Sequence, residues 1–587
     1  MERFAILGVA MLVAASVEGG VSGYRPHPHP LRHLTNAVSR AANGRPRLRV
    51  GQLLPEKYDL RDVDGESFLS PVRNQGNYGT CWAFAAMAGI EWLMRRDEGI
   101  DADLSENNLV NMHGFASGFD DGGNSAMATA VLLREDAPVA EALDPYPHPG
   151  ASVRGRGVRI PRKVVFVPRR SSVLDDDQRQ ADLDAIKRAL MDYGPLSTSY
   201  MHQEQYMKGA AYYCTISQQA NHAVSIVGWD DNYAASNFKV TPPGDGAFII
   251  RNSWGNMYEA GYLYISYYDR TLGFDDVQVA YSSLSDGAEY GKVYQHDPYG
   301  YIRSQGYDDG ERDTICGANM FVAASDELLV AFGFYALAAD TSYSVYVVRN
   351  AEMSGGILNG DWISVKNGIC YEAGYEVLPF NSPVAVTNAE RFAIVVKMTS
   401  PGQTEPLAVC CNENWDDGSP FQTNVVAHAG QSFSCPDYDS YYWDDISQGG
   451  AYFCCKVYAE PHGDYFSTTT TDTPVPYRWL DSYAGQKADP DYFLNFYCNC
   501  YNALAAHVAA NGLSIGESYA RGIDPDNAGA TNLTATISFD ASGEPVIGAV
   551  PRNAALWDYT VMGSGNLRDW HVRTAGDRFF KVTVQPK

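Results

Sequence analysis

The cysteine at position 81 constrains this chain more than any other feature, because it stands where a loop containing Gly and Asn enters an apolar helix. Apolar residues recur at helical spacing from 84 to 93. A thiol at a helix N-terminus lies near the positive end of the helix dipole and near exposed N–H groups, and both lower its pKa. The sequence therefore predicts a reactive thiolate at Cys81, with a buried structural thiol as the alternative for a lone cysteine.

Two polar residues further along the chain supply a base and a group that orients the base. His222 begins an apolar run that is typical of a strand, and Asn252 ends a second such run at 248–252. A turn bounded by Gly and a third strand at 261–265 follow. Cys, His and Asn in this order are a nucleophile, its general base and the residue that holds the base in place. Together they predict covalent catalysis through a thiol.

The sequence around these three residues resembles that of the papain-like cysteine peptidases. The matching words are Gln75-Gly76, six residues before the cysteine, Cys81-Trp82-Ala83-Phe84, His222-Ala223-Val224 and Asn252-Ser253-Trp254-Gly255. Further matches lie at 104–110, 122–123 and 193–197, so the resemblance covers about residues 54–270. It implies a two-lobed α+β peptidase domain that hydrolyses peptide bonds.

By this resemblance, the Cys81 thiolate pairs with the His222 imidazolium and attacks the scissile carbonyl. Asn252 orients the imidazole, and Trp254 covers that hydrogen bond from water. The oxyanion is expected to be held by the Gln75 side-chain amide and the Cys81 backbone N–H.

The resemblance also implies where a substrate lies. Gly122 and Gly123 fall where the family lays an extended peptide against its backbone. Ser199, Asn221 and Ala223 are expected to line the pocket for the second residue before the cut, and their character favours an apolar or uncharged side chain there. Trp254 is counted with this set as well.

The sequence departs from the family at its crosslinks. Tyr78 stands where the family has a Cys three residues before the nucleophile, Asp120 stands where its partner would be, and Met112 stands where the next bridge would start. Between residues 24 and 285 the only cysteines are Cys81 and Cys214. We expect Cys214 to be a buried apolar thiol and the domain to depend on its core.

Charge and composition limit the partners and divide the chain of 587 residues. The net charge of −26 disfavours a nucleic-acid partner, and no apolar run long enough to span a membrane follows the N-terminus.

An apolar segment at 4–17 is typical of an export signal. Residues 24–54, with six Arg and no acidic residue, look like an exposed leader whose charge could hold it against an acidic body, or a disordered arm with no role. A basic stretch at 153–170 is either a solvated loop and edge strand or an acidic docking face.

After residue 285 the chain becomes rich in short alternating runs, for example at 328–335, 343–348, 375–378 and 392–396, which predict a β-sandwich. The region resembles the lectin-like domain that follows the peptidase in some bacterial secreted papain-like proteins, through Tyr294, Asp297 and Pro298. The name implies glycan binding. A group of aromatic residues, Tyr438, Tyr441, Tyr442 and Trp443, is either a stacking platform or a surface loop.

Seven cysteines lie in this region, two pairs of them vicinal at 410–411 and 454–455. Cross-strand disulfides between these pairs are plausible, and an odd number leaves at least one thiol outside the domain's own bridges. A zinc site is the competing interpretation, but no clean Cys-x-x-Cys set is present. We predict no metal and no cofactor.

The predicted organisation is a signal peptide at 1–23, a leader at 24–53, a peptidase domain at 54–285, a lectin-like β-sandwich at 286–462, a linker at 463–476 and a mostly β accessory module at 477–587, with a helix near 492–511. The predicted function is a secreted cysteine endopeptidase whose accessory domains bind a glycan or a surface. The alternatives are a secreted binding or adhesion protein with an inactive peptidase domain, and an exopeptidase of the same fold.

Overall fold

The computed structural model describes residues 23–34 and 54–461, except 136–137, 154–157, 173–174, 287–288, 308–311 and 438–441, together with short elements beyond 461. The predicted signal peptide, apart from its last residue, and leader residues 35–53 lie outside the described residues. The chain divides into two compact units. The first comprises 1–322, 331–379 and 390–458, and the second comprises 323–330, 380–389 and 459–587.

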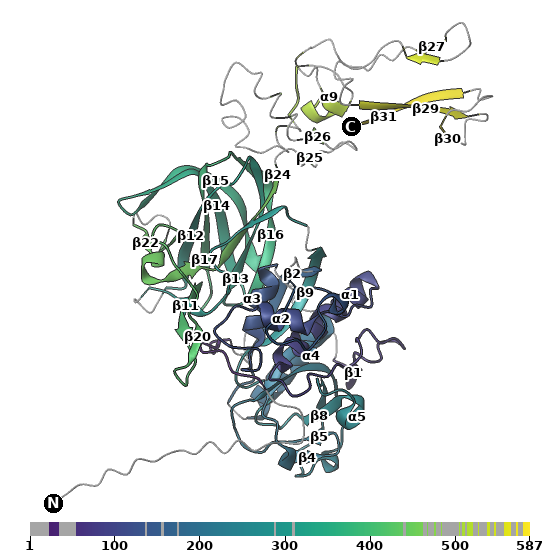
Figure 1. The fold of residues 1–587 in the computed structure, drawn as a ribbon, viewed down its shortest axis with the longest axis vertical. Helices are drawn as coiled ribbons and strands as arrows, with labels where there is room; N and C mark the ends of the chain where they lie inside the picture. The colour runs from purple at the N-terminus through teal and green to yellow at the C-terminus, as the bar shows by residue number, and fades with distance from the viewer. Residues whose placement is uncertain are drawn as a thin grey trace, which may run out of the picture. The chain divides into compact units, whose positions relative to one another are not determined.

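Helices near the N-terminus form one lobe of the first unit (Figure 1). α1 (Cys81–Glu98) buries almost every residue of its first four turns and ends at Gly99, whose φ of 68° suits a residue without a Cβ. Side-chain caps start the next two helices: Ser105 accepts the Asn108 N–H at α2 (Glu106–Met112), and Asn124 accepts the Met127 N–H at α3 (Ser125–Leu133). The buried residues of α1 fix this helix within the core of the lobe.

A mixed, mostly antiparallel sheet and one long helix form the second lobe. Its strands run in the order β9-β3-β6-β7-β8-β5-β4, and β1 also pairs with β6. The bounds are β1 (Lys57–Asp59), β3 (Leu196–Tyr200), β4 (Met207–Lys208), β5 (Ala211–Tyr212), β6 (His222–Asp230), β7 (Ala247–Arg251), β8 (Tyr262–Ser266) and β9 (Gln278–Asp286), with α4 (Asp176–Tyr193) and the short α5 (Met257–Ala260). The strands predicted at 222–229, 248–252 and 261–265 are β6, β7 and β8.

The region after residue 290 is built from strands, as the alternating runs predicted. A six-stranded sheet has the order β15-β14-β17-β12-β21-β22, and a three-stranded sheet has the order β11-β18-β23. The bounds are β10 (Lys292–Tyr294), β11 (Arg303–Gln305), β12 (Thr314–Val322), β13 (Glu327–Ala336), β14 (Thr341–Ser354), β15 (Ile357–Cys370), β16 (Gly374–Val386), β17 (Arg391–Thr399), β18 (Leu407–Cys411), β19 (Glu413–Asn414), β20 (Pro420–Gln422), β21 (Ser432–Cys435), β22 (Asp444–Asp445), β23 (Ala451–Phe453) and β24 (Cys455–Pro461).

The prediction of an aromatic stacking platform is wrong for Trp443, and two of its three tyrosines lie outside the described residues. Trp443 is buried in the core beside Phe433 and Met320, so its ring is not available to a ligand. Tyr442 is exposed, and residues 438–441 lie outside the described part of the chain.

The nine described cysteines are free thiols, so the predicted disulfides are not present in this part of the chain. β18 and β23 are neighbours as expected, but their register places Cys410 opposite Tyr452 and Cys411 opposite Ala451. The vicinal pairs are therefore offset. The directly opposed cysteines are Cys316 and Cys435, on β12 and β21.

The basic stretch at 153–170 contributes β2 (Arg159–Val167), which is not an edge strand. It pairs with β9 on one side and with residues 374–376 of β16 on the other. Lys163 Nζ lies 3.1 Å from the Glu372 carboxylate and 3.6 Å from that of Glu376. Strand pairing and charge thus join the two regions, and the docking interpretation of this stretch fits better than the solvated-loop one.

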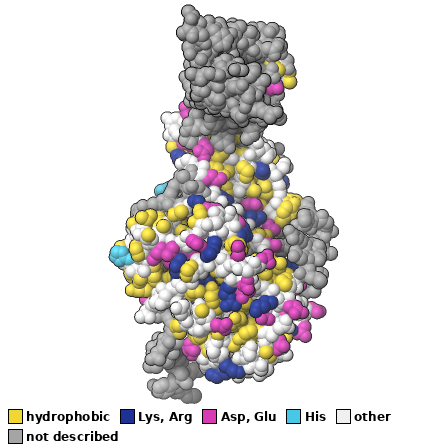
Figure 2. Space-filling model, turned by 90° about the vertical axis from the view of Figure 1, so that its right-hand side faces the viewer, with side chains coloured by type: hydrophobic (Ala, Val, Ile, Leu, Met, Phe, Trp, Pro, Cys, Tyr) yellow, Lys and Arg dark blue, Asp and Glu magenta, His cyan; other side chains and the backbone are white. Residues whose placement is uncertain are grey.

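The face shown in Figure 2 carries basic and acidic side chains intermixed among apolar and neutral ones. The net charge of −26 therefore does not collect into one acidic patch on this face. Within the described residues, no helix is both long and apolar enough to cross a membrane.

The described parts of the second unit include α9 (Ile515–Ala520), β25 (Phe466–Ser467), β26 (Val475–Pro476), β27 (Ile537–Phe539), β28 (Pro545–Ile547), β29 (Trp557–Ser564), β30 (His571–Val572) and β31 (Phe579–Pro586). β25 pairs with β26 inside the predicted linker. Most of the helix predicted near 492–511 lies outside the described residues.

Candidate active site

The first residue of α1 is Cys81, as the sequence predicted. Its thiol is fully buried, and Sγ accepts a hydrogen bond of 3.3 Å from the backbone N–H of Ala223 at the start of β6. One lobe thus supplies the thiol at a helix N-terminus, and the other lobe supplies the strand that faces it.

The imidazole of His222 is held by Asn252 and covered by Trp254. Nε2 of His222 lies 2.8 Å from Oδ1 of Asn252, and the Trp254 ring stacks on the imidazole with centroids 4.4 Å apart. Nδ1 of His222 is buried and has no hydrogen-bond partner among the described residues. The nitrogen that would exchange a proton with a nucleophile is therefore not used for structure.

Burial shifts the pKa values of Cys81 and His222 in the directions opposite to those expected for a thiolate and an imidazolium. Burial raises the pKa of the Cys81 thiol to about 11, although backbone N–H groups that include those of Ala223 and Gly23 partly offset the rise. Burial lowers the pKa of His222 to about 3. The prediction of a lowered thiol pKa is therefore wrong for this covered state, because the loss of water outweighs the helix dipole. Burial therefore favours the neutral thiol and the neutral imidazole.

Gln75 is buried beside the site, and a fixed network holds its side chain. Its Oε1 accepts a hydrogen bond of 2.6 Å from the Ser253 hydroxyl, and its Nε2 donates to the Tyr78 carbonyl at 2.8 Å. Nε2 carries two N–H groups, and the contact with Tyr78 uses one of them. The hydroxyl of Tyr146 donates to the Gln75 carbonyl at 2.7 Å. The expected oxyanion donor is thus rigidly oriented.

The cover over the site is the chain's own leader. The backbone N–H of Gly123 donates to the Gly23 carbonyl at 2.8 Å, and the Arg25 N–H donates to the Gly123 carbonyl at 3.0 Å. The Tyr24 N–H donates to the Asn221 carbonyl at 2.9 Å. Residues 23–25 therefore lie as an extended peptide along the surface where the sequence placed the substrate backbone.

Glycine is required where the leader passes. Gly122 has φ of 82°, and a Cβ there would come within 2.4 Å of the Gly23 carbonyl oxygen. A Cβ on Gly123 would meet the Trp82 ring at 2.6 Å. The structure thus gives a physical reason for both glycines that the sequence singled out.

Tyr24 occupies the neighbourhood predicted for the pocket. Ser199 and Ala223 are opposed on β3 and β6, both are buried, and Tyr24 is buried beside them. Burial raises the pKa of Tyr24, the nearby Asp276 carboxylate raises it further, and Ser199 lowers it. These effects favour the uncharged phenol.

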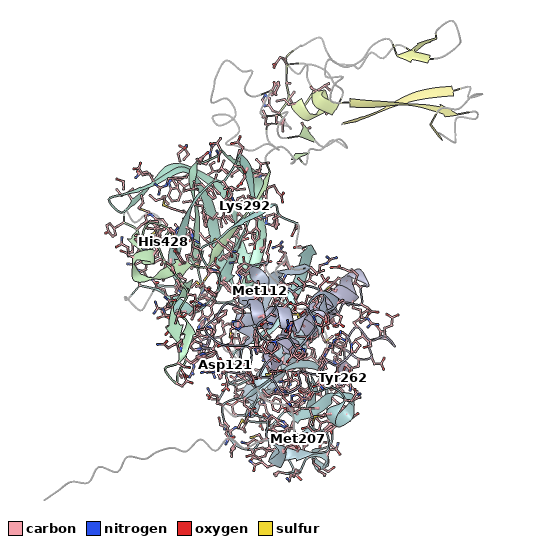
Figure 3. The ribbon with its side chains drawn as sticks, viewed as in Figure 1. Met112, Asp121, Met207, Tyr262, Lys292 and His428 are labelled. Carbon is pink, nitrogen blue, oxygen red and sulfur yellow. The ribbon has the colours of Figure 1, made fainter. Side chains whose placement is uncertain are left out.

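A hydrogen bond stands where the related peptidases have a crosslink. The Gly79 N–H donates to Oδ1 of Asp120 at 2.5 Å, and Tyr78 packs edge-on against Phe119 at 5.3 Å. These contacts tie the loop before Cys81 to the loop before Gly122 without sulfur. Met112, which stands where the next bridge would start, ends α2 (Figure 3). Cys214 is a buried free thiol, as expected.

Some residues of the site carried no signal in the sequence. Tyr146 binds both the Gln75 carbonyl and, at 2.7 Å, the Thr80 hydroxyl, although it lies outside every matching word. His202 packs edge-on against Trp254 at 4.8 Å and bonds the Tyr200 hydroxyl at 2.9 Å. Only the fold brings these side chains to the site.

Two regions of the chain match known families. Residues 54–281 match the papain family of cysteine proteases, and residues 293–459 match the lectin-like domain. Relatives include a viral cathepsin from Cydia pomonella granulosis virus, 31% identical over 214 residues, and cysteine proteinase 1 from Zea mays, 30% identical over 220 residues. Each match covers 36% of this chain, and they cover 57% and 56% of the relatives, so the chain spans little more than half of their length.

Solved structures share both regions. The clostridial cysteine protease Cwp84 after propeptide cleavage is 25% identical with a TM-score of 0.59, and the alignment covers 69% of this chain and 99% of that one. The cysteine protease and lectin-like domains of Cwp84, a surface layer associated protein of Clostridium difficile, are 24% identical with a TM-score of 0.59, covering 75% and 93%. Residues 54–281 thus form a papain-family cysteine peptidase domain, and residues 293–459 form a lectin-like domain. The predicted fold class is confirmed.

Proposed function

We propose that this chain is a cysteine endopeptidase that hydrolyses peptide bonds with Cys81, His222, Asn252 and Gln75. One observation carries the proposal: an extended peptide, residues 23–25, lies across the buried thiol and exchanges backbone hydrogen bonds with Gly123. A cleft that holds a peptide backbone beside a thiol and an oriented imidazole has the parts that amide hydrolysis needs.

The reaction starts when a substrate replaces the leader and water reaches the cleft. Nδ1 of His222 takes the Cys81 proton, and the thiolate sulfur attacks the scissile carbonyl carbon. The resulting oxyanion accepts hydrogen bonds from the Gln75 side-chain amide and the Cys81 backbone N–H. His222 then protonates the leaving amine, and the carbon–nitrogen bond breaks to give a thioester.

Water completes the cycle. His222 takes a proton from the water, whose oxygen attacks the thioester carbonyl, and the carboxylic acid leaves as the thiol is restored. Asn252 keeps the ring in one orientation throughout, because its Oδ1 binds Nε2 on the side away from the reaction. Trp254 excludes water from that hydrogen bond by stacking on the ring.

The test is hydrolysis of a fluorogenic peptide by the full-length protein after the leader has been removed or displaced. Cys81→Ala should abolish turnover, while Cys214→Ala, at the other described cysteine of the peptidase domain, should retain it. Activity that survives Cys81→Ala would refute the proposed nucleophile. A folded protein that cleaves no peptide would instead favour the binding or adhesion protein with an inactive peptidase domain.

The endopeptidase assignment has its own test within the same family. Hydrolysis of a peptide blocked at both ends supports an endopeptidase, whereas release of end residues only would identify an exopeptidase.

Export and surface attachment belong to the same proposal. The apolar segment at 4–17 supports export, and the lectin-like domain at 293–459 supports binding to a glycan or to a cell surface. Binding of the full-length protein to a glycan array tests this role, and loss of hydrolysis in Cys81→Ala should leave it unchanged. Absence of any retained glycan would remove the carbohydrate part of the proposal.

A further inference from the structure

The leader does not end in the peptidase cleft but continues onto the lectin-like domain. Tyr24, His27, Leu31 and Leu34 are buried while residues 32–33 are exposed, so the expectation of an exposed leader is wrong for most of residues 23–34. The sequence pattern misled because Arg and His usually indicate solvent, whereas here they bind acidic and aromatic side chains of another domain. The acidic body that we expected to hold the leader is the lectin-like domain.

Arg25 is bound by three kinds of contact at once. Its guanidinium lies 2.8 Å from the Asp417 carboxylate, donates to the Ser419 hydroxyl at 3.1 Å, and sits 4.1 Å from the centroid of the Trp415 ring. Trp415 is itself buried and packs edge-on against Phe421 at 4.6 Å. A planar cation over an indole and beside a carboxylate is a combination that selects a guanidinium over a neutral side chain.

Two histidines extend the contact. The His27 ring stacks on Tyr301 with centroids 5.4 Å apart and meets the edge of Phe421 at 5.3 Å. Nε2 of His29 lies 2.8 Å from the Glu413 carboxylate, and the Tyr301 hydroxyl donates to the His29 carbonyl at 3.1 Å. Side chains thus hold this part of the leader, whereas backbone hydrogen bonds hold residues 23–25.

The peptidase domain fixes this surface in place. The Ala116 N–H donates to the Phe421 carbonyl at 3.1 Å, and Phe115 packs on the Phe421 ring at 5.0 Å. The side-chain amide of Asn424 donates to the Gly114 carbonyl at 3.2 Å. The surface is therefore positioned relative to the cleft and does not hang on a free loop.

We propose that Tyr301, Glu413, Trp415, Asp417 and Phe421 form a peptide-binding surface that continues the active-site cleft onto the lectin-like domain. Its ligand is an extended peptide with an arginine followed two residues later by an aromatic or imidazole side chain. In the uncleaved chain this peptide is the leader, which the surface keeps across Cys81. Once the leader has left, the surface takes the arginine-bearing part of a peptide substrate. That last step rests on the proposed function.

The first test measures leader retention in the full-length protein and does not depend on catalysis. Amide hydrogen exchange of residues 23–34 should quicken about threefold to tenfold in Asp417→Asn and in Arg25→Ala, the range expected for one exposed ion pair with a cation–π contact. Asp361→Asn is the matched control, because this acidic residue of the same domain hydrogen-bonds Asn350 and not the leader. Unchanged exchange in both test variants would overturn the proposal.

A charge exchange separates recognition from a general loss of structure. Arg25→Glu should quicken exchange, and adding Asp417→Arg to it should restore slow exchange, because the pair is rebuilt with reversed charge. The rate of Cys81 alkylation by an epoxide should follow the same order in the unchanged protein, the single variant and the double variant. Exchange that quickens further in the double variant would show that Asp417 matters to the fold and not to the leader.

The substrate part has a separate readout. In a Tyr24→Gly, Arg25→Ala protein, which lacks the side chains that fill the pocket and the surface, extended peptides are compared with arginine or citrulline at successive positions on one side of the cut. One position should show a KM for arginine about threefold to tenfold lower, and Asp417→Asn should remove the difference. Cleavage with equal KM values at every position would overturn the substrate role. No cleavage of any peptide, with exchange behaving as expected, would refute the proposed function alone.

Discussion

The cleft and the lectin-like surface bind consecutive parts of one peptide by different physical means. In the cleft, Gly123 and Asn221 bind backbone groups of residues 23–25, and such bonds are available to almost any sequence. On the lectin-like domain, Asp417, Trp415 and Glu413 bind the side chains of Arg25 and His29, which few sequences can supply. The difference teaches that chemistry and selectivity can be located on separate domains of one chain.

The largest expected effect acts on the chemistry alone. Cys81→Ala should lower kcat by about 10⁴-fold or more, because no other group supplies the nucleophile. It should change amide exchange of residues 23–34 little, since Gly123 and the lectin-like domain hold the leader and the thiol contacts it only through the Gly23 N–H. Turnover assays and exchange on the same sample check both halves of the prediction. Faster leader exchange in this variant would show that Cys81 also holds the leader and would contradict the separation of chemistry from leader binding.

A smaller loss follows when one oxyanion donor is removed. Gln75→Ala should lower kcat by about 10²-fold with little change in KM, because the donor acts on charge that develops only in the transition state. Gln75→Glu keeps the bond from the Ser253 hydroxyl but removes the N–H donors and with them the bond to the Tyr78 carbonyl, so it should lower kcat at least as far. Steady-state kinetics decide the point, and wild-type turnover in Gln75→Ala would assign the residue to structure.

Low pH should weaken the docking of those leader residues whose side chains contact the lectin-like domain. Burial lowers the pKa of His27 to about 4 from an ordinary value of 6.5. Docking therefore favours the neutral ring, and its contribution is complete above pH 6.5 and is lost as the pH falls towards 4. Each pH unit within this window weakens docking about tenfold.

The other groups that face His27 are His29, Glu413, Tyr301 and Phe421, and the His27 backbone N–H binds the Asp276 carboxylate, whose pKa burial raises to about 6. A His29→Gln background removes the other imidazole of this contact, which lies 2.8 Å from the Glu413 carboxylate. In that background, exchange of residues 23–34 should quicken about tenfold between pH 6 and pH 5, and His27→Phe should flatten the profile. A flat profile with His27 intact would contradict this assignment.

The smallest expected effect concerns the loops on either side of the cleft. Asp120→Ala removes the hydrogen bond to the Gly79 N–H, which should lower the free energy of unfolding by about 0.5–1.5 kcal/mol. Asp121→Ala, at the next position, is the control because its carboxylate bonds Gly118 within its own loop. Denaturant unfolding of both variants measures the difference. Equal stability would mean that Tyr78 and Phe119 alone replace the missing crosslink.

The sequence predicted those parts of the site whose residues can be identified from their immediate neighbours in the chain. Cys81 begins a helix and His222 begins a strand, and short motifs around each identify the cleft. A Cβ at Gly122 would clash with the leader backbone, and a Cβ at Gly123 would clash with the Trp82 ring. The roles of these residues remain proposals, but their positions around one cleft follow from the order of the family's motifs along the chain.

The parts that escaped prediction depend on contacts between distant segments. Tyr146 reaches Gln75 from a loop about 70 residues away, and nothing near it in the sequence marks that contact. Arg25 and Asp417 are 392 positions apart, and each alone looks like an ordinary surface charge. The covered state of the site was missed for the same reason, because the basic charge of the leader suggested an acidic body but did not identify which domain supplies it.

The most direct test of the account is the alkylation of thiols by a peptide-like epoxide, mapped by mass spectrometry over the whole chain. We expect one label per molecule, at Cys81. It should form slowly in the unchanged protein and quickly in the Tyr24→Gly, Arg25→Ala protein. The His222→Ala version of the second protein should not be labelled. Labels spread over several cysteines, or none at Cys81 in a folded protein with the weakened leader, would contradict it.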